Sequence, residues 1–339
     1  KGVMIKGIPK GKYHKKIPFR TGSFFALIFI LTQISEVSEI LGILNHAKPL
    51  FVFLALILIL VWIATLGFSY FVIYRLVGIK ESYLHMVTLS SAAINFVGIV
   101  TPSAGISTLL LLISDAKEKC ISSARVTFAC MLYLLFDYFA LFITALVGLL
   151  ILQANHQLTW LEIAATCLLG GIIGGLVLVL FLSSKHLDLL KKILSAIFQT
   201  LNRIIRIFSK KTRISDEQIT HFAEEIHIGS QTIHNNFRLL FLPVSLAFVN
   251  KALLILILSS LFLAFGLAFD LGVVISGFTL GYLFTIISPT PSGIGVMEGM
   301  MTLALNTLGV ELESAAILTL AFRAITFWIP FFGGMVAFR

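Results

Sequence analysis

Long apolar runs separated by short polar turns dominate the chain. Two stretches, 82–114 and 271–310, are apolar but interrupted by proline and glycine. A weak run at 22–44 loses its apolar character at two glutamates. With the five strong runs listed below, the pattern predicts an all-α polytopic membrane protein with six full spans and two interrupted segments, about eight membrane segments in all. The strong runs lie at 50–77, 126–152, 160–182, 239–265 and 315–338.

The sharpest interruption lies between residues 286 and 299. Each proline removes a backbone donor and each glycine loosens the backbone, so a helix cannot pass through unbroken. In hydrocarbon, broken helices occur only where protein or a water-filled cavity supplies hydrogen-bond partners. The stretch is therefore a candidate transport site. Its turn residues are Pro289, Pro291, Ser292, Gly293 and Gly295.

The first interruption, at Pro102, Ser103 and Gly105, has basic residues at both of its ends. Because Lys and Arg mark the cytoplasmic side, the segment is expected to enter and leave on that side. Its 33 residues (82 to 114) are too few for two full spans of about 20 residues each. A re-entrant hairpin is predicted. For 271–310, entered from the outer face, a re-entrant hairpin and two full crossings both stay open.

The two interrupted segments match with opposite orientation. Pro102 lies 52 residues after Leu50, and Pro289 lies 50 residues after Leu239, each counted from the start of the preceding span. Both tips carry Pro-Ser followed by small residues. We interpret the match as an inverted-topology repeat, with a site near the midplane where the two breaks meet.

Four segments follow from the charge pattern. Residues 1–20 hold seven Lys/Arg and no acid, which indicates a cytoplasmic N-terminal segment. Residues 21–182 form the first membrane half and 239–339 the second, whose C-terminus is also placed in the cytoplasm. Between them, 183–238 is a basic cytoplasmic linker with an amphipathic helix suited to an anionic membrane surface.

Composition narrows the function classes. Only 12% of the residues are charged, against about a quarter in soluble domains. The net charge of +9 is explained by basic residues that orient the spans, so we expect no nucleic-acid partner. The cysteines have no ligand spacing, and His221 to His227 indicates a solvated helix face, so we expect no metal and no cofactor. No nucleophile–base pair appears at working spacing, and we expect no enzymatic activity.

Four charged residues within apolar runs are candidate site residues. A bare charge such as Arg323 costs roughly 2.5–3.5 kcal/mol or more in mid-span. We expect Arg323 to face a cavity and to pair with Glu298 or a lipid phosphate, with a buried structural ion pair as the alternative. Asp137 is expected to pair with Arg323, bind a cationic head group, carry a proton or pair structurally. Lys251 either snorkels to the interface or belongs to the site. The half-helix starts near Ala104 and Gly293 favour an anion such as phosphate.

The stretch 288–299, together with Arg323, Trp328-Ile329-Pro330 and Gly333-Gly334, resembles the lysylphosphatidylglycerol synthase transmembrane family. In the first half, Asn95, Pro102, Gly105 and Asp137 resemble family positions. The resemblance implies a plasma (inner) membrane protein with two re-entrant hairpins that moves aminoacylated phospholipids or polyprenyl-linked and other glycolipids. The chain departs from the family pattern at Ser292, where glycine is usual, and at Ile106, where an acid is common. It also lacks the soluble acyltransferase domain, so we expect no synthase activity.

These features favour a lipid translocator whose partners are membrane lipids with anionic head groups. An ion-coupled small-solute transporter is an alternative with the same architecture. A membrane scaffold for a lipid-modifying synthase or a glycosyltransferase is another. The oligomeric state stays open, a homo-oligomer included.

Overall fold

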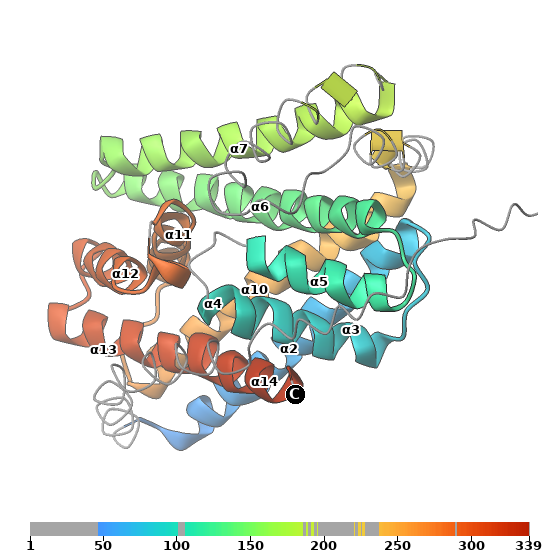
Figure 1. Ribbon diagram of the computed structural model, residues 1–339. Helices are drawn as coiled ribbons and strands as arrows, with labels where there is room; N and C mark the ends of the chain where they lie inside the picture. The colour runs from blue at the N-terminus through green and yellow to red at the C-terminus, as the bar shows by residue number, and fades with distance from the viewer. Residues whose placement is uncertain are drawn as a thin grey trace, which may run out of the picture.

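The computed structural model describes residues 47–100, 106–185, 237–288 and 290–338, with scattered positions between 188 and 227. Every regular element within these residues is a helix (Figure 1). The predicted helical fold class is confirmed in this part of the chain. The basic segment 1–20, the weak run 22–44 and the first tip, 101–105, lie outside the described residues, as does most of the linker.

In the part of the chain that the structure describes, five helices are long and apolar enough to cross a membrane. They coincide with the five strong apolar runs, and the chain is a membrane protein. The fifth is continuous but contains a π-helical turn, η4, between α13 and α14. The elements are α2 (Pro49–Leu76), α6 (Ser123–Ala154), α7 (Trp160–Lys185), α10 (Phe241–Ala264), α13 (Leu312–Arg323), η4 (Ala324–Trp328) and α14 (Ile329–Ala337).

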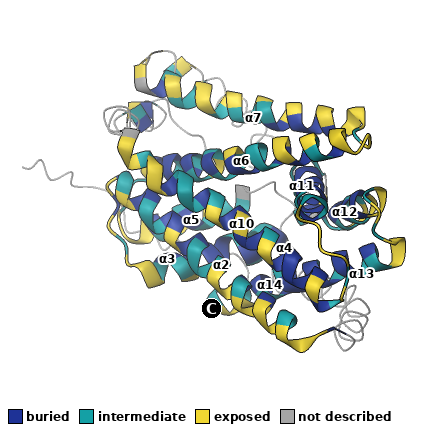
Figure 2. Ribbon diagram, turned by 180° about the vertical axis from the view of Figure 1, so that it is seen from behind, coloured by how far each residue is buried: buried dark blue, intermediate teal, exposed yellow. Residues whose placement is uncertain are grey.

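The five spans differ in how much of their surface neighbouring helices cover. An 18-residue window of the span that contains α10 is 61% buried, whereas that of α7 is 17% buried, and much of α7 is exposed (Figure 2). Helix α2 packs along α10, and α7 packs on α6. The polar and charged residues of α10 therefore need partners inside the protein, whereas α7 faces lipid.

The first interrupted segment begins with α3 (Tyr83–Ser90), whose N-cap Ser82 accepts a hydrogen bond from the His85 N–H. It continues through the π-helix η1 (Ser91–Val97) and α4 (Gly98–Val100). Helix α5 (Ile106–Glu118) is its second arm and packs on η1 and α6. The predicted break lies in residues 101–105, between α4 and α5 and outside the described residues.

In the second interrupted segment, a helix also lies on each side of the break. Helix α11 (Leu271–Ile287) begins at Asp270, whose carboxylate caps it, and the 3-10 turn η3 (Pro291–Gly293) follows the break. Helix α12 (Val296–Thr307) then packs against α11 and α13. At 17 and 12 residues, α11 and α12 are both shorter than the about 20 residues of a full crossing. The re-entrant path and the inverted repeat stay predictions.

The helix that precedes the first break approaches the second tip. Helix α4, which ends directly before the first tip, contacts η3 at the second tip. Ile99 and Ile294 meet there in one apolar cluster with Trp328 and Phe331 of the last span. The regions that the sequence places at a common site are therefore neighbours in the fold.

The last span lies against the first interrupted segment through a glycine. A Cβ on Gly334 would lie 2.5 Å from the Ser91 carbonyl oxygen and 3.1 Å from the Phe96 Cβ. Gly334→Ala is therefore expected to destabilise the protein by about 1–3 kcal/mol through overpacking. Thermal unfolding in detergent measures the loss.

The neighbouring glycine supplies a matched control. A Cβ on Gly333 meets nothing within 4 Å, so Gly333→Ala is expected to change stability by less than about 1 kcal/mol. Equal effects of the two substitutions would contradict a close contact between α14 and η1.

Candidate functional site

The second tip reverses the chain with three left-handed residues. The φ angles are 51° at Ser292, 69° at Gly293 and 81° at Gly295. A Cβ on Gly293 would lie 2.8 Å from the Thr285 Cγ2 and 2.9 Å from its Cα, so only glycine fits there. Ser292 holds a conformation that glycine adopts at lower cost. Strained backbone of this kind often marks functional sites.

Side chains of the tip supply hydrogen-bond partners for the broken backbone. The Thr290 N–H donates to the Ser288 Oγ at 3.1 Å, and the Thr290 Oγ1 donates to the Ile294 carbonyl oxygen at 2.9 Å. The Gly293 N–H donates to the Thr290 carbonyl oxygen at 3.1 Å. A helix break inside a membrane protein requires this internal pairing.

Arg323 and Glu298 form an ion pair beside the tip. The Arg323 Nε donates to the Glu298 Oε1 at 2.6 Å, and the Arg323 Nη2 donates to the Ser292 carbonyl oxygen at 3.4 Å. The guanidinium lies 4.5 Å from the centroid of the Phe327 ring. The predicted pairing of Arg323 with Glu298 is present, and it joins the last span to the second interrupted segment. The predicted cavity beside Arg323 stays a prediction.

Glu298 also caps the helix that carries it. Its Oε2 accepts a hydrogen bond from the Gly295 N–H at 2.7 Å, and α12 begins one residue later. The start of α12 therefore differs from the expectation in two ways. It lies at 296 instead of near Gly293, and its N-cap N–H is occupied by a carboxylate of the same chain. Glu298 thus holds a negative charge between a helix N-terminus and a guanidinium, both of which favour an anion.

A second buried ion pair joins Lys251 of α10 to Asp137 of α6. The Lys251 Nζ lies 2.7 Å from the Asp137 Oδ1, and the side chains are 7% and 19% exposed. Lys251 therefore pairs inside the protein and does not snorkel. The alternative in which Asp137 pairs with Arg323 is wrong, because each has another partner.

Tyr282 of α11 lies between the two ion pairs and was missed from the sequence. The Lys251 Nζ is 5.8 Å from the centroid of its ring, and its ring is also near that of Phe322, the neighbour of Arg323. A single tyrosine in an apolar helix carries no sequence signal of this position, which arises from the packing of α11 against α6 and α12.

Of the remaining candidate site residues, the structure describes some and not others. Asn95 is buried in η1, and its Nδ2 has no hydrogen-bond partner among the described residues. Pro291 opens η3. The other predicted tip residues lie outside the described residues and stay predictions: Pro102, Ser103, Gly105 and Pro289.

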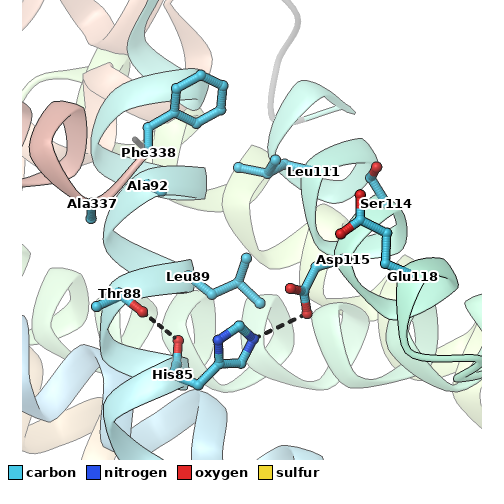
Figure 3. A pocket seen from close by; sticks show the side chains of 10 residues that line it. All are labelled: His85, Thr88, Leu89, Ala92, Leu111, Ser114, Asp115, Glu118, Ala337 and Phe338. Carbon is cyan, nitrogen blue, oxygen red and sulfur yellow. Dashed lines mark hydrogen bonds and ion pairs between the residues drawn. The ribbon is translucent and has the colours of Figure 1, made fainter. Parts of the chain in front are cut away.

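A second polar group was also missed from the sequence. A pocket of about 300 Å³ lies between α3, α5 and the end of α14, with His85 and Asp115 on its wall (Figure 3). The His85 Nε2 is 3.1 Å from the Asp115 Oδ2. The two residues stand 30 positions apart, near opposite ends of the stretch 82–114. The contact depends on how separate helices pack, so no local sequence signal predicts it.

One comparison with known proteins identifies a family. A family model described as "Lysylphosphatidylglycerol synthase TM region" matches residues 19–334. The match includes both interrupted segments and all four residues of the two ion pairs. No curated protein matches the chain.

Proposed function

Because the chain belongs to the lysylphosphatidylglycerol synthase TM region family, we propose that it is a lipid translocator that moves a phosphate-bearing lipid between the membrane leaflets. The observation that carries the proposal is the Glu298 carboxylate, held between the start of α12 and the Arg323 guanidinium. Helix N-termini and guanidinium groups are the protein groups that bind phosphate best. Glu298 thus occupies the position that suits a lipid phosphate.

In this mechanism, the lipid phosphate and Glu298 compete for Arg323. A guanidinium has five N–H donors, of which the bonds to Glu298 and Ser292 use two. The phosphate binds the remaining donors and displaces the carboxylate. Glu298 returns when the lipid leaves, so the site is never left with an unpaired buried charge. Exchange of one anion for another avoids the large cost of isolating Arg323 in an apolar environment.

The surroundings of the site suit a lipid better than a water-soluble anion. Leu303 of α12 and Phe332 and Val336 of α14 are exposed on the helices that flank the ion pair. Exposed apolar side chains on membrane helices face acyl chains. A head group can therefore follow the polar tip while its acyl chains stay in the bilayer.

Glu298→Gln separates binding from release. The amide oxygen still accepts from the Gly295 N–H, but the charge that competes with the phosphate is gone. We expect lipid transport to fall at least about tenfold, a loss of about 1.4 kcal/mol or more, while bound phosphate lipid is retained or increased. A fluorescent-lipid reduction assay in liposomes measures transport, and mass spectrometry of the purified protein measures bound lipid.

Glu313→Gln is the control, because Glu313 is exposed in the first turn of α13. This substitution should leave both the rate of lipid transport and the amount of bound lipid unchanged. If Glu298→Gln transports lipid at the wild-type rate, the anion-exchange mechanism is wrong.

The function itself is tested by reconstituting the purified protein with phosphatidylglycerol, an aminoacylated phospholipid or a polyprenyl-phosphate glycolipid. Accelerated movement of at least one of them between leaflets supports the proposal.

The buried Lys251–Asp137 pair favours a second candidate, an ion-coupled small-solute transporter, because paired charges in a membrane interior can exchange a proton or cation. Solute uptake without movement of any of these lipids would favour that candidate.

A further inference from the structure

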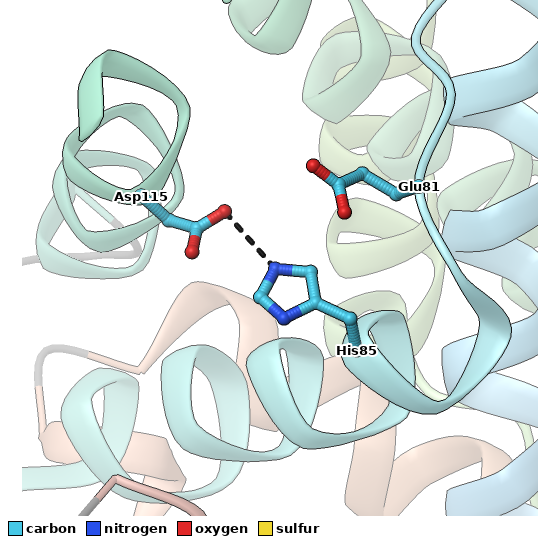
Figure 4. A group of neighbouring side chains, drawn as sticks. All are labelled: Glu81, His85 and Asp115. Atoms are coloured by element: carbon cyan, nitrogen blue, oxygen red, sulfur yellow. Dashed lines mark hydrogen bonds and ion pairs between the residues drawn. The ribbon is translucent and has the colours of Figure 1, made fainter. Parts of the chain in front are cut away.

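Three side chains from both arms of the first interrupted segment gather at its base. Glu81 lies in the connection before α3, His85 in the first turn of α3, and Asp115 near the end of α5. One ligand atom from each lies within 4.8 Å of the other two (Figure 4). An imidazole with two carboxylates is a common ligand set for a divalent transition metal.

The three groups already surround one cation, the Lys119 ammonium. The Lys119 Nζ lies 3.0 Å from the Glu81 Oε1, 3.2 Å from the Asp115 Oδ2 and 2.5 Å from the His85 Nε2. The three acceptor atoms thus converge on a single point. Lys119 is about one-third exposed on its side chain, so its ammonium can move into solvent.

We propose that Glu81, His85 and Asp115 form a binding site for a divalent transition-metal ion such as Zn²⁺, which takes the place of the Lys119 ammonium. Zinc–oxygen and zinc–nitrogen bonds are about 2.0–2.2 Å long, so each ligand atom moves inward by roughly 0.5–1 Å from its distance to the ammonium. The ion balances both carboxylates and releases Lys119 to solvent. A water molecule would supply a fourth ligand.

The site would fasten the two arms of the segment to each other. Glu81 and His85 precede the break, and Asp115 follows it, so one ion joins both sides at the base. The inference is independent of the lipid-transport proposal, because no residue of the Arg323 site takes part.

Calorimetric titration of the purified protein with Zn²⁺ tests the proposal. We expect one saturable site in the wild type and at least about tenfold tighter binding in Lys119→Met, because the competing ammonium is gone. His85→Gln and Asp115→Asn should each lose the site. His156→Gln, which removes an exposed histidine in the α6–α7 turn, should bind like the wild type.

Thermal unfolding gives a second readout. Saturating Zn²⁺ should raise the Tm of the wild type and of Lys119→Met but leave that of His85→Gln unchanged. Absence of saturable binding in both the wild type and Lys119→Met would overturn the proposal. Equal binding by His85→Gln and the wild type would also overturn it, by showing adventitious binding elsewhere.

Discussion

Arg323→Ala is expected to abolish lipid translocation. The substitution removes the guanidinium that we propose holds the phosphate, and it takes the ion-pair partner from Glu298. Without these charge-assisted hydrogen bonds, transport should fall at least about a hundredfold, a loss of about 2.7 kcal/mol or more. Arg323→Lys keeps the charge but loses the bidentate geometry, so it should retain partial activity. The liposome assay measures both variants.

A matched arginine control separates loss of charge from loss of the site. Arg125 is exposed near the start of α6, and Arg125→Ala should transport lipid at the wild-type rate. All variants are first shown to be monodisperse in detergent. Wild-type transport by a folded Arg323→Ala protein would remove Arg323 from the mechanism.

Lys251→Met is expected to destabilise the protein by about 3–5 kcal/mol, because it leaves the Asp137 carboxylate buried without its cation. Methionine keeps most of the lysine volume, so little of the loss comes from packing. The double variant Lys251→Met/Asp137→Asn removes both charges and should recover most of the stability. Denaturant unfolding in detergent measures the three free energies of unfolding.

The same variants show whether the Lys251–Asp137 pair is structural or takes part in transport. Recovery of stability together with transport in the double variant indicates a structural pair. Recovery of stability without transport places the pair in the transport cycle. If Lys251→Met alone unfolds at the wild-type denaturant concentration, the two charges do not depend on one another, and the described contact is incorrect.

The sequence predicted the Arg323–Glu298 pair for a reason that does not depend on the fold. An arginine in the middle of a span needs an anionic partner, and Glu298 stands next to a break that the chain must place within reach of other helices. The partner of Asp137 was left open among Arg323, a cationic head group, a proton and an unnamed structural partner, because the choice depends on which helix faces α6. Packing of α10 against α6 brings Lys251 to it.

The helix boundaries were predicted for a similar reason. Long apolar runs can satisfy their backbone groups in a membrane only as helices, so the five strong runs became α2, α6, α7, α10 and the last span. The π-helical turns η1 and η4 were not predicted. An extra residue in a helical turn leaves no periodic signal in an apolar run. Close contacts between helices, such as that of Gly334 with Ser91, were not predicted either, because they depend on how the helices pack.

By itself, therefore, the sequence determined the helical membrane class, the places where helices break and the need of Arg323 for an anion. These follow from local chemistry: hydrocarbon demands paired backbone groups and paired charges, and proline and glycine prevent the pairing along one helix. Only the tertiary structure decided which charges meet, that Tyr282 lies between them, and that Glu81, His85 and Asp115 converge on Lys119. Those arrangements depend on how separate helices pack, and residues far apart in the chain carry no local sign of it.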